Sequence, residues 1–126
     1  MRKTIRILFA TLLAAVSAGT LAHHSTANFN KNEVTTITGK VTYFSFANPH
    51  SFIDVDVAEG NDTAPYKVFA TSKVVLIRYG WRPTSVKPGD TITVSGYPDY
   101  DNPSFLYLTE ITFADGHKWL RGDVAE

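Results

Sequence analysis

The stretch KVTYFSFANPHSFIDVDV, residues 40–57, decides the fold of this chain. It consists of a run of β-branched and aromatic residues, an Asn-Pro-His break at residues 48–50, and a second run of the same kind. Such runs favour strands, and a proline pushes the residue before it into an extended conformation and ends the ladder. The second run alternates apolar and acidic residues, as a half-buried strand does: Ile53, Asp54, Val55, Asp56 and Val57. The stretch therefore predicts two strands with His50 at the bend between them.

Five strands and one helix are expected along the whole chain, including the two strands of this stretch. The strand-forming segments are 33–47, 51–58, 65–70, 91–97 and 105–113, with a short further strand at 117–120. Residues 71–79 change to a helical period, with Thr71 or Ser72 as the N-cap and Gly80 as the stop. A helix between the third and fourth of five strands is the order of the OB-fold, a partly open barrel, whereas a sandwich usually has about seven strands. The predicted class is therefore all-β with one short helix, built as a five-stranded OB-fold-like barrel.

Four residues have predicted roles in closing this barrel or in attaching the arm to it. Gly39 interrupts the first strand, and the apolar residues after it change face, which predicts a bend or bulge. Gly96 in the fourth strand indicates a close approach of two backbones. Trp81, just after the helix, is expected to plug one end of the core. Phe29 is expected to pin the polar arm at residues 23–32 to the body.

The first 22 residues have the pattern of a secretory signal peptide. Three basic residues lie among the first six, residues 7–16 are apolar, and Thr20 and Ala22 stand at the −3 and −1 positions of a cut after residue 22. The alternative is an uncleaved membrane anchor, but the apolar run is shorter than the ~20 residues that a span needs. The expected organisation is a signal peptide at 1–22, an arm at 23–32, a barrel domain at 33–120 and a tail at 121–126. The mature protein is expected to be exported, periplasmic in a Gram-negative cell, and without a stable membrane anchor.

Composition excludes several kinds of site. The chain has no cysteine, so disulfides, thiolate metal sites and cysteine nucleophiles are excluded. Residues 23–126 carry 9 basic and 12 acidic side chains, a net charge of −3. Binding of nucleic acid needs a basic surface that opposes the phosphate charges. We therefore expect no nucleic-acid partner.

A set of short motifs, in a fixed order, resembles a known family. The motifs are His23-His24-Ser25, Gly39-Lys40-Val41, NPH at 48–50, LIRYGW at 76–81, KPGD at 87–90, VSGYP at 94–98 and DG at 115–116. Together they resemble the small exported bacterial proteins known as domain of unknown function 6152, over essentially the whole mature chain. The third strand of that family usually carries a Trp and an acidic residue before the helix, whereas residues 66–70 here are YKVFA. The resemblance implies an OB-fold-like barrel but no established activity.

A metal site at the mature N-terminus is the first functional hypothesis. A cut after residue 22 leaves His23 with a free α-amino group, which can chelate one ion together with Nδ1 of its own ring. His24 adds a second imidazole, and His50 is a candidate to complete the set. Imidazole and amine nitrogens suit Cu(II), which binds most tightly among the common divalent ions, whereas zinc prefers a closed set of four ligands. In the structural alternative, the two histidines are a polar chain start and His50 satisfies backbone groups at a corner.

A ligand site without metal is the second hypothesis. In an OB-fold the first and last strand–strand loops flank the binding mouth, and here they are residues 47–51 and 98–104. Aromatic side chains there can stack on a sugar, a peptide or a small ring, and the alternative is that they belong to the core. The candidate ligand-binding residues are Asn48, Tyr97, Asp99, Tyr100 and Asp101.

Catalysis is the least supported class. The chain has no phosphate-binding glycine loop, no G-x-S-x-G and no H-E-x-x-H motif. A terminal histidine resembles the copper brace of oxidative polysaccharide enzymes, but those enzymes use a larger sandwich. Asp54 and Asp56 share the outer face of a strand, where a carboxylate pair is usually solvated. We therefore expect a binding protein, with copper as its candidate cofactor and a metal-free ligand or protein module as the alternative.

Overall fold

The computed structural model describes residues 26–122. The predicted signal peptide, His23 and His24, and residues 123–126 of the predicted tail lie outside this range. The elements are a 3-10 helix η1 (Thr26–Asn28), strands β1 (Thr35–Ser45), β2 (Ser51–Glu59) and β3 (Asp62–Thr71), helix α1 (Lys73–Arg78), and strands β4 (Thr91–Pro98), β5 (Phe105–Thr112) and β6 (Lys118–Leu120). The predicted order of five strands with a helix between the third and fourth is confirmed.

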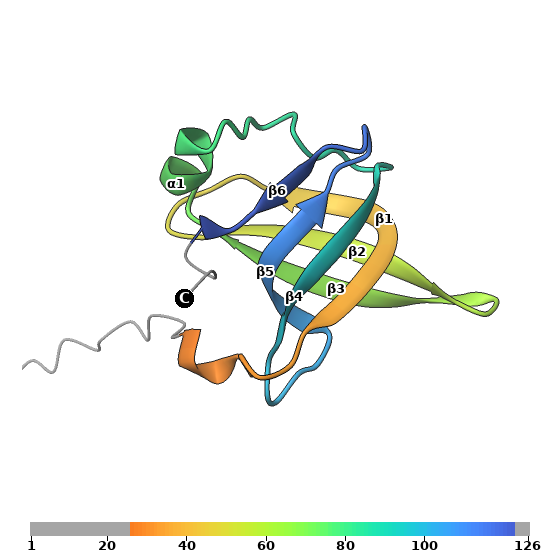
Figure 1. The fold of residues 1–126 in the computed structure, drawn as a ribbon. Coiled ribbons are helices and arrows are strands. Elements are labelled where there is room, and N and C mark those ends of the chain that lie inside the picture. The colour runs from red at the N-terminus through yellow and green to blue at the C-terminus, as the bar shows by residue number, and fades with distance from the viewer. Residues whose placement is uncertain (1–25, 123–126) are drawn as a thin grey trace, which may run out of the picture.

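The sheet closes on itself to form a barrel. Its strand order is β3-β2-β1-β4-β5-β6, and a parallel pairing of β3 with β5 joins the two sides. All other neighbouring strands are antiparallel. Five strands therefore form the closed barrel and β6 extends it beyond β5 (Figure 1). This is the predicted OB-fold-like architecture.

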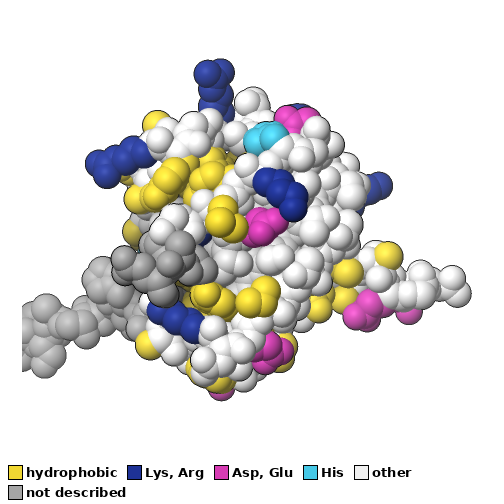
Figure 2. Space-filling view, in the orientation of Figure 1, with side chains coloured by type: hydrophobic (Ala, Val, Ile, Leu, Met, Phe, Trp, Pro, Cys, Tyr) yellow, Lys and Arg dark blue, Asp and Glu magenta, His cyan; other side chains and the backbone are white. Residues whose placement is uncertain are grey.

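The hairpin of β2 and β3 projects well beyond the barrel (Figures 1 and 2). The two strands pair out to Glu59 and Asp62, so β3 begins three residues before the predicted start. The predicted strand began at Pro65, although proline cannot donate to a ladder and is found mainly at edges. In the structure Pro65 pairs with Asp56 on one side, while β5 contacts β3 on the other side only at residues 67–69. Proline is tolerated at such an edge position.

The barrel bends where the strands approach one another most closely. β1 and β2 change register between Val41 and Tyr43, two residues after Gly39, which confirms the predicted bulge. A Cβ on Gly39 would lie 2.5 Å from the carbonyl oxygen of Asp56, so only glycine fits there. After the bulge Tyr43 is exposed and Phe44 packs against the core, as the predicted change of face requires.

The core fills the barrel with branched aliphatic side chains from all five strands. They include Ile53 and Val55 of β2, which are the inward positions predicted from the alternation. Trp81 closes one end with 4% of its surface exposed. Its ring lies 5.0 Å from Phe113 and 5.4 Å from Trp119, measured between ring centroids. The prediction that Trp81 plugs the core is confirmed.

Helix α1 is short and is fixed at both ends. The Ser72 hydroxyl accepts a hydrogen bond from the backbone N–H of Val75 at 3.3 Å, the N-cap arrangement expected from the sequence. Gly80 follows the helix with a φ of 84°, which glycine adopts without strain. Of the apolar residues on α1 only Leu76 is buried. The helix therefore lies across one end of the barrel with much of its apolar surface uncovered.

Candidate functional site

A row of four aromatic side chains crosses the outer surface of the barrel. The strand registers pair Phe52 with Phe69, Phe69 with Tyr107, and Tyr107 with Tyr97, so the row runs over β2, β3, β5 and β4. Successive ring centroids are 5.7, 5.6 and 6.3 Å apart. These distances are typical of attractive aromatic pairs. We call these four residues the aromatic row, which with its neighbours forms a second apolar cluster outside the core.

Phe29 covers the aromatic row from the N-terminal side. Its ring lies 5.2 Å from Phe105 and 5.4 Å from Tyr107, and only 5% of its surface is exposed. The backbone beside it is also held: Asn30 N–H donates to the carbonyl of Pro98 at 2.8 Å. The prediction that Phe29 pins the arm to the body is confirmed.

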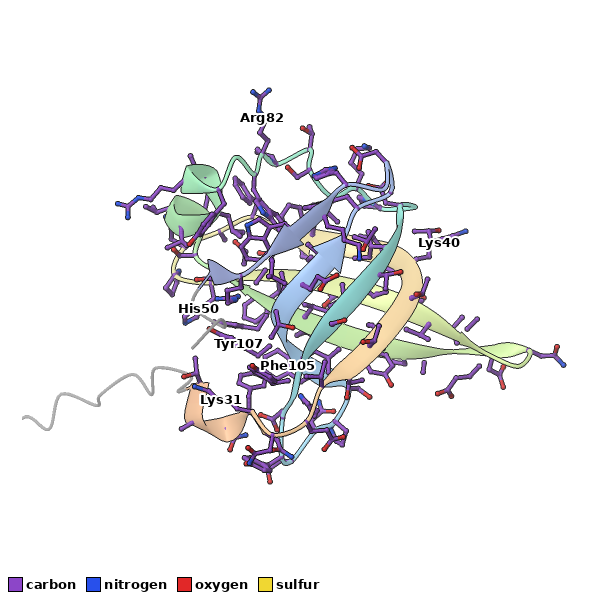
Figure 3. All side chains as sticks on the ribbon, in the orientation of Figure 1. Lys31, Lys40, His50, Arg82, Phe105 and Tyr107 are labelled. Carbon is purple, nitrogen blue, oxygen red and sulfur yellow. The ribbon has the colours of Figure 1, made fainter. Side chains whose placement is uncertain are left out.

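His50 lies at the β2–β3 end of the same row. Its ring centroid is 4.8 Å from that of Phe69 and 6.4 Å from that of Phe52. Figure 3 shows His50, Tyr107 and Phe105 along one side of the barrel, with Lys40 on the opposite side. Phe69 therefore contacts both His50 and, at 6.3 Å, the Phe29 ring of the arm. The His50 imidazole and the arm meet on one patch of surface.

Arg121 is a buried cation that the sequence analysis assigned to the tail. Its Nε donates to the carbonyl of Leu108 at 2.7 Å, and its Nη1 donates to the Tyr107 hydroxyl at 3.1 Å. Its guanidinium carbon lies 4.3 Å from the centroid of the Tyr107 ring, a cation–π contact. No local pattern marks this residue, because its partners are 13 and 14 positions away in the sequence. It fixes Tyr107, the central ring of the row.

Asp99 links the arm to the loop at residues 98–104. One carboxylate oxygen accepts from the backbone N–H groups of Asp101 and Asn102 at 2.8 and 2.9 Å, and the other from the Asn28 side chain at 2.5 Å. Burial of the carboxylate raises its pKa, but the hydrogen bonds from Asn28, Asp101 and Asn102 outweigh burial, and the pKa of Asp99 lies below its usual value. Asp99 therefore has a structural role in its ionised form.

We expect Asp99→Asn to lower the free energy of unfolding by about 1–2 kcal/mol at pH 7, because the amide NH₂ faces the NH₂ of Asn28. A depressed carboxyl pKa stabilises the fold above the unfolded value of about 4, and this contribution is lost as pH falls through the folded value. The difference in the free energy of unfolding between variant and parent should therefore become smaller below about pH 4. Urea titrations from pH 7 to 3 measure it, with Asp101→Asn at an exposed neighbour as the control. A difference that stays constant over this range would contradict the assignment.

The other predicted ligand residues divide between structural and exposed positions. The Asn48 side chain accepts from the backbone N–H of Val74 at 3.2 Å, which ties residues 47–51 to α1. Tyr97 belongs to the aromatic row. Tyr100 is 61% exposed and Asp101 is also exposed. Asn48 is exposed as well, so three of the predicted residues present exposed side chains at the predicted mouth, and the oxygen of one of them is used by α1.

No metal-ligand set is complete within the described residues. Between positions 26 and 122 there is no group of three His, Asp or Glu side chains arranged to hold an ion. His50 does not form one with Asp99 or Asp101. Any site at His50 therefore needs ligands from outside this range, where His23 and His24 lie.

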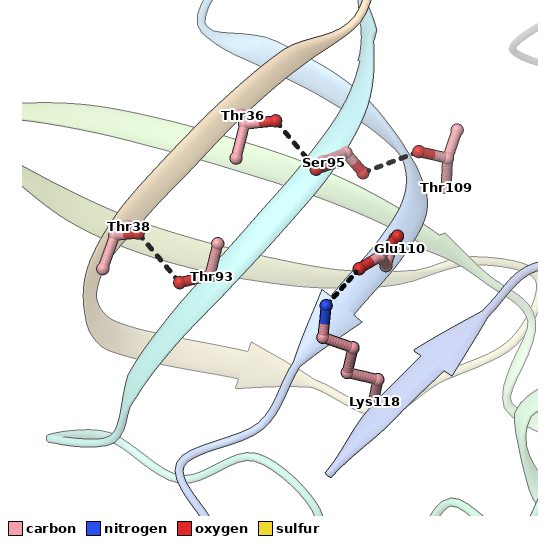
Figure 4. Close-up of polar contacts among 7 residues, drawn as sticks. All are labelled: Thr36, Thr38, Thr93, Ser95, Thr109, Glu110 and Lys118. Atoms are coloured by element: carbon pink, nitrogen blue, oxygen red, sulfur yellow. Dashed lines mark hydrogen bonds and ion pairs between the residues drawn. The ribbon is translucent and has the colours of Figure 1, made fainter. Parts of the chain in front are cut away.

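The outer surface of β1 and β4 has a different, polar character. Thr36 and Ser95 share a hydrogen bond between their hydroxyls, as do Thr38 and Thr93, both at 2.8 Å (Figure 4). On β5 and β6, Lys118 and Glu110 form an exposed ion pair at 3.2 Å. Such cross-strand pairs each stabilise a sheet by at most about 1 kcal/mol. This surface is therefore a hydrogen-bonded sheet exterior, and the aromatic residues are concentrated on the other side.

None of the helices formed by residues 26–122 has the length and apolar character needed to cross a membrane.

Comparisons with known proteins agree with the fold. The sequence profile of a family described as "Family of unknown function (DUF6152)" matches residues 10–105. A search of curated proteins gives no match. A crystal structure of the mitochondrial single-stranded DNA binding protein Rim1 from S. cerevisiae (Form2) is similar with a TM-score of 0.50 at 12% identity, over 64% of this chain and 92% of that chain. Its Form1 structure has a TM-score of 0.45 at 12% identity, over 64% and 93%. At such identities the likeness concerns the fold alone.

Proposed function

The chain belongs to the DUF6152 family of unknown function, and we propose that it is an exported periplasmic protein that binds Cu(II) or a similar divalent ion through His23, His24 and His50. It acts by binding rather than by catalysis. Its role is the handling or sensing of the metal.

The meeting of the arm with His50 carries this proposal. Phe69 contacts the rings of both His50 and Phe29. His23 is three residues before Thr26, the first residue of η1, and three residues span at most about 10 Å. The arm that follows the two histidines is held by Phe29 against Phe69, the same ring that His50 contacts. This shared contact favours a site in which His50 joins ligands from the start of the mature chain.

The chemistry of the ligands fits copper and predicts a pH dependence. The α-amino group and Nδ1 of His23 form one chelate ring, and two further imidazoles complete a set of nitrogen donors that Cu(II) favours. All of these nitrogens must be deprotonated, and imidazole and α-amine have ordinary pKa values of about 6.5 and 8. Protons therefore compete with the metal, and binding weakens as pH falls from 7.5 toward 5.

We expect one Cu(II) to bind per molecule of the protein that begins at His23. The heat of binding for Zn(II) should be smaller. Calorimetry at pH 7.5 measures this after intact mass has confirmed the first residue. Acetylation of the α-amino group of His23 removes the amine from the chelate and should weaken binding by at least about tenfold. His50→Gln should have a smaller effect in the same direction, because two nitrogens from His23 remain.

His117→Gln is the matched control, because His117 is exposed on a turn and its Nδ1 interacts with Asp115. It should bind copper as the parent does. Weak binding without stoichiometry, unchanged by acetylation of the α-amino group, would reject the copper proposal.

A metal-free ligand site at the barrel mouth is the second candidate, favoured by the exposure of Tyr100 and Asp101. Asn48 and Asp99 form hydrogen bonds within the protein, so few polar groups at this site remain for a ligand. Binding by stacking on Tyr100 would be insensitive to pH between 5 and 7.5, which distinguishes it from the metal site.

Single-stranded nucleic acid is not among the ligands that we propose, although Rim1 is described as a single-stranded DNA binding protein. Residues 23–126 have a net charge of −3, which repels a phosphate backbone. Bases are commonly bound by stacking on aromatic side chains, and Phe29 already covers the aromatic row.

A further inference from the structure

A second candidate site is a pocket beside α1. The pocket has a volume of about 550 Å³. Its walls are Phe46, Lys73, Ile77, Gly80, Trp81, Arg82 and Pro83. Sites for small molecules typically have volumes of ~300–1,000 Å³, mostly apolar walls and a few polar groups. The pocket meets each of these conditions, and it shares no residue with the proposed metal site.

One wall residue of the pocket, Trp81, carries a buried polar group that lacks a partner within residues 26–122. Trp81 is 4% exposed, and its buried Nε1 donates no hydrogen bond within the part of the chain that the structure describes. A smaller hollow of about 140 Å³ adjoins the pocket through Gly80 and Trp81, and there Trp119 Nε1 is a second buried donor without an acceptor among residues 26–122. An unsatisfied buried N–H costs about 1–3 kcal/mol, so these donors favour a ligand that brings an acceptor.

The rim of the pocket is positively charged. Lys73 and Arg82 line it, and none of the wall residues is acidic. Within residues 26–122 neither cation takes part in an ion pair. Figure 3 shows the Arg82 side chain reaching outward from its loop into solvent. In Figure 2 hydrophobic side chains gather at this end of the molecule with Lys or Arg side chains around them.

The apolar walls continue onto exposed helix surface. Ile77 in the wall is 53% exposed, and Val74 and Tyr79 nearby are 48% and 51% exposed. Large apolar side chains in such a group mark a binding surface more often than a bare exterior. A ligand with an apolar body would cover Ile77 and Phe46, and an anionic head would lie near Lys73 and Arg82.

We propose that this pocket binds a small amphipathic carboxylate, with its apolar body against Phe46, Ile77 and Trp81 and its carboxylate on Lys73, Arg82 and a tryptophan N–H. A carboxylate fits better than a phosphate group, because enclosure of a phosphate usually involves several backbone N–H groups or a helix N-terminus as well as cations. One or two cations and a single N–H donor satisfy the two oxygens of a carboxylate.

Octanoate and indole-3-acetate are the probes, titrated into the protein without added metal and followed by calorimetry. Tryptophan fluorescence gives a second signal for octanoate, because Trp81 forms a wall of the pocket. Saturable binding with a dissociation constant below about 1 mM is expected for at least one carboxylate. Octan-1-ol should bind at least about tenfold more weakly, and octylammonium weaker still, because both lack the negative charge.

The variant Lys73→Gln with Arg82→Gln should weaken carboxylate binding by about tenfold and leave octan-1-ol unchanged. Arg78→Gln is the matched control, since Arg78 is an exposed cation on α1 outside the pocket wall. Ile77→Asp should abolish binding, and its side chain is exposed enough for the fold to tolerate the change. Trp81→Phe tests the N–H donor while it keeps an aromatic ring.

Failure of both carboxylates to bind would overturn the proposal. Equal affinity for octanoate, octan-1-ol and octylammonium would also overturn it, because the site would then be apolar without selecting an anion. Neither result bears on copper binding, because none of the residues that line the pocket belongs to the proposed metal site.

Discussion

Phe29→Ala is expected to lower the free energy of unfolding by about 3 kcal/mol, the range found when a buried aromatic ring is removed. The ring is 5% exposed and contacts Phe69, Phe105 and Tyr107 at centroid distances of 6.3, 5.2 and 5.4 Å. The other contacts of the arm are hydrogen bonds to the loop at residues 98–104, because η1 has no buried residue. The loss should therefore free the whole arm and expose the aromatic row.

The release of the arm gives Phe29→Ala a second expected effect. The Tyr100 amide donates to the carbonyl of Asn28 at 3.0 Å, so its hydrogen exchange should become faster. If the proposed copper site includes His50, copper binding by the protein that begins at His23 should weaken, because His50 stays on Phe69 when the arm is released. Tyr100→Ala is the matched control, since this ring lies at the same end but is 61% exposed and should change stability by less than about 0.5 kcal/mol.

Urea unfolding and amide exchange measure both effects. A stability within about 0.5 kcal/mol of the parent, together with unchanged protection of the Tyr100 amide, would mean that Phe29 does not hold the arm. If stability falls but copper affinity is unchanged, the arm is held as described and His50 is not a ligand.

The fold was predictable because its signals are local. Alternation in residues 51–58, the N-cap Ser72 and the stop at Gly80 each concern neighbours in the sequence. The boundaries were less accurate where tertiary contacts decide them. β3 extends past Pro65 because that residue lies at an edge, which only the closed barrel reveals.

The aromatic row was not predictable, because register between distant strands creates it. The alternation assigns Phe69 to the side opposite Val68, and therefore to the outer face. Nothing in the local sequence says that Tyr107 lies beside it, since that pairing closes the barrel between β3 and β5. Arg121 was missed for the same reason. An excess of phenylalanine and tyrosine at outward strand positions was the only available signal.

In the two loops that were predicted to bind a ligand, the prediction assigned too many residues to the site. Asn48 and Asp99 are polar residues in loops, and the sequence analysis read them as groups available to a ligand. In the structure Asp99 accepts from the backbone N–H groups two and three residues ahead, a common role of such residues in turns, and also from the Asn28 side chain. Asn48 accepts from the backbone N–H of Val74, 26 residues away. A loop residue of this type therefore supports a binding site only after its local hydrogen bonds have been counted.

Gly96→Ala is expected to be at least as destabilising as Phe29→Ala, at about 3 kcal/mol or more, because the clash is with backbone. An ideal Cβ at this position lies 2.5 Å from the carbonyl oxygen of Tyr107, 3.0 Å from its carbonyl carbon and 3.2 Å from Cβ of Leu106. A side chain can rotate away from such a contact, but a carbonyl group in a ladder cannot. Strands β4 and β5 would have to separate where their register already shifts, between Ser95 and Gly96.

The separation would also disturb the aromatic row, because the carbonyl that is displaced belongs to Tyr107. Its ring stacks on Tyr97 with an interplanar angle of 5°, and its hydroxyl accepts from Arg121. Gly96→Ala should therefore broaden the near-ultraviolet circular dichroism of the tyrosines as well as lower the urea midpoint. Gly39→Ala should have a similar cost, since its Cβ would lie 2.5 Å from the carbonyl oxygen of Asp56, but it should leave the tyrosine signal unchanged.

Gly60→Asn is the control that distinguishes the effect of a steric clash from the effect of replacing a glycine. Gly60 has a φ of 58° at the tip of the β2–β3 hairpin, with no atom within 4 Å of an added Cβ, and asparagine tolerates this conformation. We expect a change below about 0.5 kcal/mol for this variant. If Gly96→Ala changed stability as little as Gly60→Asn, strands β4 and β5 could separate at Gly96 at little cost. Their close approach at Gly96 would then not be needed to close the barrel beneath the aromatic row.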